Sequence, residues 1–143
     1  MLKENVKKQL IDGLNEGLAA ELGTVIRCTY QAGKSFGLQG AELREILEKE
    51  VQDELRHASF LTDAIIDLGG EPTTAPQPFE KRDTLKAMLE LDLKMETEGV
   101  ENYKKHSQIA DGLGDVELKV KLEEMAADEA GHAREIRRLL KGL

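Results

Sequence analysis

The chain has 143 residues, a length typical of a single domain with a sizeable core. Charged residues make up 34% of it and aromatic residues 3%, which favours helices, because strands are enriched in aromatic and β-branched side chains. The net charge of −8 argues against a nucleic-acid partner, since phosphates are bound by clustered Lys and Arg. We therefore expect one all-α domain over residues 1–143.

The cysteine count and the hydropathy of the chain indicate the cellular compartment to expect. Cys28 is the single cysteine, so no internal disulfide can form, which is typical of a reducing compartment. The first ten residues, MLKENVKKQL, hold no apolar stretch of signal-peptide length, and no apolar run is long enough to span a membrane. We expect a cytoplasmic protein with no membrane partner.

Three clusters of helix-breaking residues divide the chain into four segments. The clusters are GKSFGLQG (33–40), GGEPTTAPQP (69–78) and DGLGD (111–115). In each segment apolar residues recur at helical spacing. The four stripes run through Leu10, Leu14, Leu18 and Val25; Leu43, Leu47, Leu61 and Ile65; Leu85, Leu89, Met95 and Tyr103; and Leu118, Leu122, Met125 and Ile136. One wide apolar stripe on each helix predicts a four-helix bundle.

The second connection decides how the two helical hairpins are joined. Residues 70–80 contain three prolines, and extended polyproline-like chain covers about 3.1 Å per residue. This length nearly spans a bundle of this size, so a long crossover and a simple antiparallel return are both feasible. Spacing alone does not choose between them.

Every apolar stripe is interrupted at mid-length by an acidic residue, and two of the four interruptions add a histidine. Carboxylates are rarely buried unless they are paired or bound to a metal. The interrupting residues are Glu21, Glu54, His57, Glu96, Glu129 and His132.

The spacing of these residues reveals an internal repeat. Glu21 precedes Glu54 by 33 residues, and Glu96 precedes Glu129 by the same interval. An offset of 75 residues maps each member of the first set onto the second, His57 onto His132 included. The midpoints of the two intervals fall inside the first and third breaker clusters. In an antiparallel hairpin, each lone Glu is therefore expected to face a Glu-x-x-His motif at one level.

Such a set has the composition of a metal centre. Residues i and i+3 share a helix face, so Glu-x-x-His directs an oxygen and a nitrogen to one point. Two such motifs and two further carboxylates can hold two divalent metals, with one carboxylate from each motif bridging them. Without metal, four carboxylates at one level would repel and take up protons. The alternative is a bundle with surface acids, but two of the three histidines share the motif.

These residues give the chain a resemblance to a known family. It resembles ferritin-like di-iron carboxylate proteins, and bacterioferritins most, over nearly its whole length. The resemblance is carried by NEGLAAELGTVI, VQDELRHASFL, IIDLGGEPT, LELDLKMETEG and AADEAGHAREI. It implies a ferritin-like four-helix bundle made of two antiparallel helical hairpins joined by a long crossover.

The resemblance also implies roles for the six residues. Glu54 and Glu129 would bridge two irons, Glu21 with His57 would complete one iron site, and Glu96 with His132 the other. Glu98 is the rival ligand on the third helix. It breaks both the 75-residue offset and the apolar stripe, and we expect it to face solvent.

The activity that the resemblance implies is ferroxidase. Two Fe(II) ions per subunit would be oxidised to Fe(III) by O₂ or H₂O₂, for iron storage or detoxification, in a homo-oligomer that is a dimer or larger. Manganese is an alternative metal, because the ligands discriminate weakly between Mn and Fe. A rubrerythrin-like peroxidase that reduces H₂O₂ and a metal-binding bundle without turnover are the alternative functions.

Further residues acquire expected roles from the same comparison. In the family, aspartates like Asp53 and Asp128 hold the histidine of the facing helix, and a tyrosine like Tyr103 lies near the irons. Cys28 occupies the matching place on the first helix, either as a redox residue or as a small apolar one.

One departure from the bacterioferritin pattern matters for cofactors, and one histidine lies outside the proposed site. Leu55 stands where bacterioferritins carry the methionine that binds haem, so we expect no haem. His106 has no carboxylate at ligand spacing, and we expect it to be a surface histidine.

Overall fold

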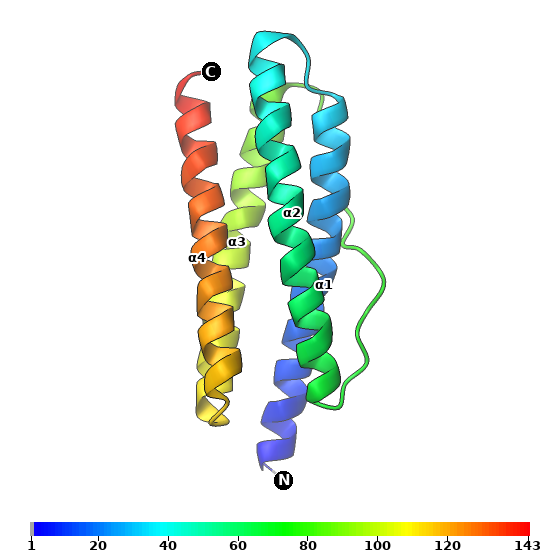
Figure 1. Ribbon diagram of the computed structural model, residues 1–143, viewed down its shortest axis with the longest axis vertical. Helices are drawn as coiled ribbons and strands as arrows, with labels where there is room; N and C mark the ends of the chain where they lie inside the picture. Colours follow the sequence, from blue (N-terminus) through cyan, green and yellow to red (C-terminus); the bar gives the residue numbers. More distant parts are fainter. Residues whose placement is uncertain (1) are drawn as a thin grey trace.

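The computed structural model describes residues 2–143, which form four helices and, within that range, no strand. These are α1 (Leu2–Gly33), α2 (Gly37–Asp67), α3 (Leu85–Gly112) and α4 (Val116–Lys141). α1 and α2 pack as one antiparallel hairpin and α3 and α4 as a second, side by side in one bundle (Figure 1). The all-α ferritin-like bundle is confirmed. None of the described helices is both long and apolar enough to cross a membrane.

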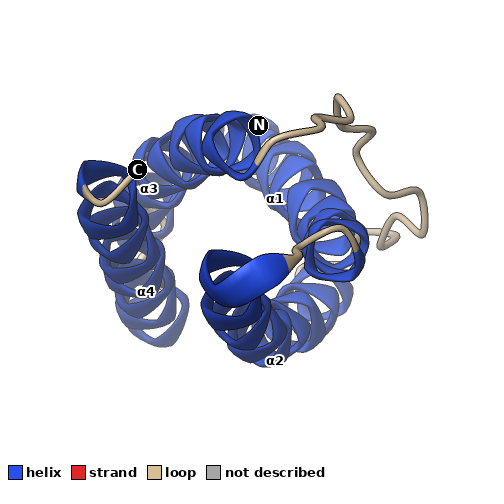
Figure 2. Ribbon diagram, turned by 90° about the horizontal axis from the view of Figure 1, so that it is seen from above, coloured by secondary structure: helices blue, strands red, loops and turns tan. Residues whose placement is uncertain are grey.

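The connection between the hairpins is a long crossover. Residues 68–84 leave the end of α2 and run along the outside of α1 to the opposite end of the bundle, where α3 begins (Figure 1). Viewed along the bundle, this segment lies on the outer side of α1 (Figure 2). The choice between crossover and antiparallel return, which spacing left open, is thus settled in favour of the crossover.

The crossover is fastened to α1 along its length. The side chain of Asn15 accepts a hydrogen bond from the backbone N–H of Thr73 at 2.8 Å. Further along, the N–H of Gln77 donates to the carbonyl of Ala19 at 2.8 Å. A Cβ at Gly23 would lie 2.4 Å from the Gln77 carbonyl oxygen, so the close approach requires glycine there.

Local chemistry fixes the ends of α3 and α4. Thr84 caps α3 by accepting a hydrogen bond from the N–H of Ala87 at 3.1 Å. Asp115 caps α4 in the same way, accepting from Leu118 at 3.1 Å. Such caps satisfy donors that the first helical turn leaves free. Gly114, between α3 and α4, has φ 78°, a conformation that favours glycine and reverses the chain.

The loop between α1 and α2 is shorter than the first cluster of helix-breaking residues predicts. α2 already begins at Gly37 and includes Gly40, although both lie in the predicted breaker cluster. A Cβ at Gly40 would lie 2.6 Å from the carbonyl carbon of Ser35. Gly40 is therefore a helical residue that lets the preceding turn pack closely.

Two apolar clusters fill the bundle on either side of its mid-level. One contains Leu10, Leu14, Leu61, Ile65 and Leu122, and the other contains Cys28, Leu43, Leu47, Leu89 and Ile136. A fully buried leucine or isoleucine stabilises the fold by about 1.5–3 kcal/mol. The clusters therefore stabilise the bundle enough to tolerate a polar layer between them.

Candidate metal centre

The six side chains that interrupt the apolar stripes meet in this polar layer. Glu54 is 0% exposed and Glu96 is 1% exposed, so these two carboxylates are shielded from bulk water. Ligand atoms within 4.8 Å of one another form two groups. One group is Glu21, Glu54, His57 and Glu129, and the other is Glu54, Glu96, Glu129 and His132. The two motif glutamates belong to both groups, as bridging carboxylates would.

His57 lies between the two hairpins. Its Nδ1 atom points into the layer, 3.3 Å from Oε2 of Glu21 and 3.1 Å from Oε1 of Glu129. Its Nε2 atom points outward and lies 2.9 Å from Oδ2 of Asp128. The aspartate thus holds the ring from the far side, which leaves Nδ1 directed at the carboxylates.

His132 repeats this arrangement in the other half of the layer. Its Nδ1 atom lies 3.4 Å from Oε1 of Glu54 and 3.6 Å from Oε2 of Glu96. Its Nε2 atom lies 2.9 Å from Oδ2 of Asp53, which also pairs with Arg56. Asp53 and Asp128 therefore contact the histidines of facing helices, as the resemblance implies.

Several buried polar atoms in the layer have no hydrogen-bond partner among the described residues. They are both carboxylate oxygens of Glu54, both of Glu96, Oε1 of Glu129 and Nδ1 of His132. Buried polar groups without partners are rare in proteins, and each costs about 1–3 kcal/mol. All six atoms belong to the two ligand groups, so the donor set fits hard divalent cations.

Protonation states in the metal-free layer follow from crowding. Burial, followed by the neighbouring Glu96 and Glu54 carboxylates, raises the pKa of Glu129 well above its ordinary value. Burial would also raise the pKa of Glu96, but the neighbouring Glu129 carboxyl and His132 imidazole lower it. Burial opposes the charge on His132, yet the neighbouring Glu54 and Glu96 carboxylates raise its pKa to about 12. His132 therefore carries a proton at neutral pH, and crowding favours the protonated form of Glu129.

Tyr103 is in contact with the layer. Its hydroxyl donates a hydrogen bond to Oε1 of Glu21 at 2.7 Å, and its ring meets the His57 imidazole edge-on with centroids 6.2 Å apart. Burial raises the pKa of Tyr103 well above its ordinary value, so the phenol stays protonated. Tyr103 therefore orients the carboxylate of Glu21, which lies next to His57 in the layer.

Cys28 occupies the matching place on α1 but contacts a different residue. Its Sγ atom is 3.9 Å from Oε2 of Glu50, and the side chain is fully buried. Burial and then Glu50 raise the pKa of the Cys28 thiol, which keeps it in its unreactive form. Burial, and next the charge of Glu96, raise the pKa of Glu50 to about 8.

The layer continues into polar side chains that the sequence analysis did not identify. Arg27 on α1 is 1% exposed, and its Nε lies 2.9 Å from Oδ1 of Asp92 on α3. Gln31 donates to the same oxygen at 2.9 Å. A signal existed in the sequence, because Glu50 and Asp92 each precede a layer glutamate by four residues on the buried face. Neither residue has a counterpart 75 positions away that is acidic, so the repeat did not identify them as part of the layer.

A cavity of about 470 Å³ reaches the layer from outside. It lies between α1 and α3, against the crossover segment, whose residues Thr73, Ala75, Pro76, Gln77 and Pro78 line it. Glu21, Glu96 and Glu129 line it as well. Small molecules and ions therefore have a route to three of the six side chains.

Glu98 lies at this cavity rather than in the layer. It is exposed, as expected, but it also lines the cavity and does not face bulk solvent alone. It belongs to neither group of ligand atoms. Next to it, a Cβ at Gly99 would lie 3.6 Å from Oε2 of Glu129, so a side chain there would face the layer.

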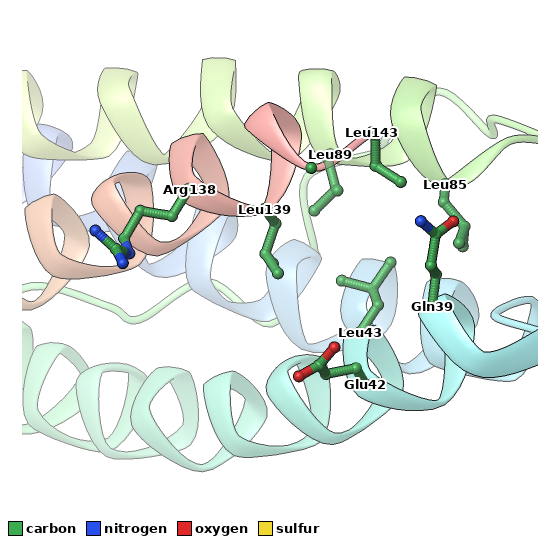
Figure 3. A pocket seen from close by; sticks show the side chains of 9 residues that line it. Gln39, Glu42, Leu43, Leu85, Leu89, Arg138, Leu139 and Leu143 are labelled. Carbon is green, nitrogen blue, oxygen red and sulfur yellow. The ribbon is translucent and has the colours of Figure 1, made fainter.

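A second cavity, of about 230 Å³, lies at the end of the bundle where α4 finishes. Leu43, Leu85, Leu89 and Leu139 dominate its lining, with Glu42 and Arg138 on its walls (Figure 3). None of the six layer residues lines it. It is an apolar recess of the bundle end and has no geometry for metal ligation.

His106 is not a surface histidine. Only 6% of it is exposed, and it packs against α1 where Gly13 leaves room. A Cβ at Gly13 would lie 2.0 Å from the ring atom Nε2. The expectation was wrong because the glycine that accommodates the ring is on another helix.

Sequence comparison places this bundle in a family. The model of the ferritin-like domain matches residues 11–143. The chain belongs to the ferritin-like family. Among curated ferritin-like proteins, a bacterioferritin of Brucella melitensis is 33% identical over 127 residues, covering 87% of this chain and 78% of the relative.

Solved ferritin-like structures agree with the fold. A ferritin-like di-iron carboxylate protein of Bacillus anthracis superposes with a TM-score of 0.92 at 39% identity, covering 94% of this chain and 97% of that one. The bacterioferritin of Mycobacterium tuberculosis gives a TM-score of 0.85 at 27% identity, covering 93% and 84% of the two chains. The bundle is thus ferritin-like in sequence and in three dimensions.

Proposed function

We propose that the protein is a ferroxidase that binds two Fe(II) ions per subunit and oxidises them to Fe(III) for iron storage or detoxification. The observation that carries the proposal is the pair of overlapping ligand groups that share Glu54 and Glu129. The Bacillus anthracis structure is described as a di-iron carboxylate protein, which supports iron as the metal. Carboxylates favour the oxidised product, because hard anionic oxygens stabilise Fe(III).

In this proposal each side chain of the layer has a defined task. Glu54 and Glu129 would contact both ions, Glu21 and His57 would complete one site, and Glu96 and His132 would complete the other. The substrate Fe(II) supplies one electron per ion to the oxidant.

The remaining residues position these ligands and handle protons. Asp128 and Asp53 hold the two imidazoles, and Tyr103 holds Glu21. Glu129 and His132 give up their protons as metal binds, since ligands bind metal in the deprotonated form. The cavity between α1 and α3 supplies the route for Fe(II) and for the oxidant.

Association between subunits and the absence of haem complete the proposal. Ile26, Leu55 and Ile66 on α1 and α2 are 48%, 46% and 56% exposed, and we propose that they contribute to contacts between subunits. Leu55 offers no thioether to a haem iron. Protein mixed with haem should therefore elute from gel filtration without a Soret band, and a stoichiometric band would refute this part.

Anaerobic titration of the metal-free protein with Fe(II), followed by addition of O₂ or H₂O₂, tests the function. We expect saturation at two Fe(II) per subunit and a rise in ultraviolet absorbance from Fe(III) after either oxidant. A parallel titration with Mn(II) compares the alternative metal. Saturation at one ion, or two bound ions that neither oxidant oxidises within minutes, would contradict a ferroxidase. The second result would favour a metal-binding bundle without turnover.

A further inference from the structure

One charged side chain on the wall of the outer cavity has no part in the functions above. Arg27 lines the cavity together with Glu21 and Glu96, yet it is 1% exposed. Its partner Asp92 precedes Glu96 by four residues on α3, which corresponds to a rise of about 6 Å along the helix. The guanidinium therefore lies about one helical turn from a carboxylate of the metal layer.

The contacts of Arg27 leave part of its hydrogen-bonding capacity free. Nε donates to Asp92 at 2.9 Å, and Nη1 donates to the sulfur of Met95 at 2.9 Å. A guanidinium has five N–H donors, and a thioether is a weak acceptor. The guanidinium is thus fixed in place by two contacts and retains donors next to the cavity.

Stability does not explain why an arginine is buried here. Taking an ion pair out of water costs about as much as the pair gains, and an apolar pair of similar volume is often at least as stable. The internal repeat does not explain the buried arginine either. The residue 75 positions after Arg27 is Asn102, which is uncharged and exposed. Arg27 is a feature of one half of the site only, on the side where small molecules reach the layer.

We propose that Arg27 is an oxidant-binding residue that directs hydrogen peroxide to the metal layer and makes it the preferred oxidant over O₂. This inference rests on the proposed ferroxidase function. Peroxide can accept hydrogen bonds from the guanidinium through its oxygen lone pairs, whereas apolar O₂ gains almost nothing from a charged donor. The positive charge also stabilises the negative charge that develops on the departing oxygen when the O–O bond breaks.

The balance of the reaction is simple. H₂O₂ takes one electron from each of two Fe(II) ions, its O–O bond breaks, and two protons from the medium convert the two oxygens into two waters. The iron ions leave as two Fe(III). Arg27 donates hydrogen bonds in this step and is itself unchanged.

The test compares both oxidants in wild type and in three variants of the 143-residue chain. Arg27→Lys keeps the charge and loses the planar fork. The double variant Arg27→Gln with Asp92→Asn removes both charges together, which avoids leaving Asp92 buried and unpaired. Arg44→Gln, at an exposed position on α2, removes one positive charge away from the cavity and serves as the matched control.

Stopped-flow oxidation of bound Fe(II) gives the first readout. We expect wild type to react faster with H₂O₂ than with O₂. In the double variant kcat/KM for H₂O₂ should fall about 10- to 100-fold while the O₂ rate changes less than about twofold, as expected for loss of a charged hydrogen bond to one oxidant. In Arg27→Lys, kcat/KM for H₂O₂ should fall less than in the double variant, and in Arg44→Gln it should equal the wild-type value.

Binding of azide to Co(II)-loaded protein, followed by visible absorption, gives a readout without turnover. We expect two Co(II) per subunit in every form and about tenfold weaker azide binding in the double variant. Equal losses with both oxidants, or unchanged azide affinity, would show that Arg27 acts only through structure and would overturn the inference. Wild type that neither loads Co(II) nor oxidises Fe(II) would instead refute the ferroxidase function itself, and this inference with it.

Discussion

Oδ2 of Asp128 on α4 lies 2.9 Å from Nε2 of His57 on α2, so one hairpin orients the candidate ligand of the other. The relation is reciprocal, because Asp53 on α2 is 2.9 Å from Nε2 of His132 on α4. Each contact holds Nε2 on the aspartate side and directs Nδ1 at the carboxylates of the layer, the side from which it could bind a metal. The two halves of the layer can therefore be assembled only when the hairpins are docked.

Asp128→Ala should weaken metal binding without unfolding the protein. Asp128 is more than half exposed at its side chain, so its loss removes an orienting contact and little packing. We expect Co(II) affinity to fall about 10- to 100-fold, as is usual when the partner of a ligating histidine is removed. Asp115→Ala, which removes a helix cap, is a control for general destabilisation. Wild-type Co(II) affinity in Asp128→Ala would show that the contact is dispensable.

Glu54→Ala or Glu129→Ala should abolish fast Fe(II) oxidation, whereas Glu98→Ala should retain most of it. A bridging carboxylate contacts both metals, so its removal takes a ligand from each. Stopped-flow absorbance measures the rates. Glu98 lies outside both ligand groups and is the matched control on the cavity wall.

The same variants carry a stability signature. Metal-free Glu54→Ala should be as stable as wild type or more so, because a buried carboxyl group whose oxygens accept no hydrogen bond is removed. The increase in melting temperature on adding metal should shrink. Calorimetry of the metal-free and metal-loaded forms measures both melting temperatures. A large loss of stability in the metal-free variant, with the metal effect intact, would make Glu54 a structural residue.

Metal binding should release protons and strengthen as pH rises. The pKa of His132 is raised to about 12, so His132 is protonated at neutral pH, and burial with the carboxylate neighbours raises the pKa of Glu129, which favours its protonated form. Metal must displace these protons, and a higher pH lowers the cost of doing so. Calorimetric titration with Co(II) in buffers of different ionisation enthalpy should give about two protons per filled site pair. No dependence on the buffer would contradict these protonation states.

Glu50→Gln should stabilise the metal-free protein at alkaline pH. The folded pKa of Glu50, about 8, lies above its ordinary value of 4.5, so the folded state holds this proton more tightly than the unfolded state. Stability therefore falls as pH rises from about 4.5 to about 8 and stays low above that range. We expect a gain of about 2–4 kcal/mol at pH near 9 and almost none at pH near 4. Urea denaturation measures it, with exposed Glu48→Gln as control.

Gly13→Ala should destabilise the bundle by about 1–3 kcal/mol, because the new methyl group would collide with the buried His106 ring. Adding His106→Ala should recover part of that loss, which a double-mutant cycle would reveal as coupling. Gly131→Ala is the matched control, since nothing lies within 4 Å of its Cβ, and there helix propensity predicts a gain of up to about 1 kcal/mol. Equal effects of the two substitutions would contradict the packing of His106.

The sequence determined the helices and the level at which the six polar residues meet. Helical periodicity places Glu54 and His57 on one face, and mirror spacing about a short turn brings Glu21 opposite them. Both are local geometry, because a hairpin with a tight turn has little freedom of register. For that reason the three polar residues of each hairpin could be predicted to meet at one level. Their arrangement into two groups that share Glu54 and Glu129 was implied by the resemblance and depends on docking of the hairpins.

Only the tertiary structure decided how the hairpins dock and what surrounds the layer. Proline spacing allowed either a crossover or an antiparallel return between α2 and α3. The choice depends on contacts such as that of Gln77 with Ala19, which are 58 positions apart in the sequence. Arg27 and Asp92 became partners, and His106 found its pocket at Gly13, across helix pairs whose alignment no single helix encodes. The physical reason is that burial and ion pairing depend on the neighbour that is brought close, and long-range neighbours are set by packing of the whole bundle.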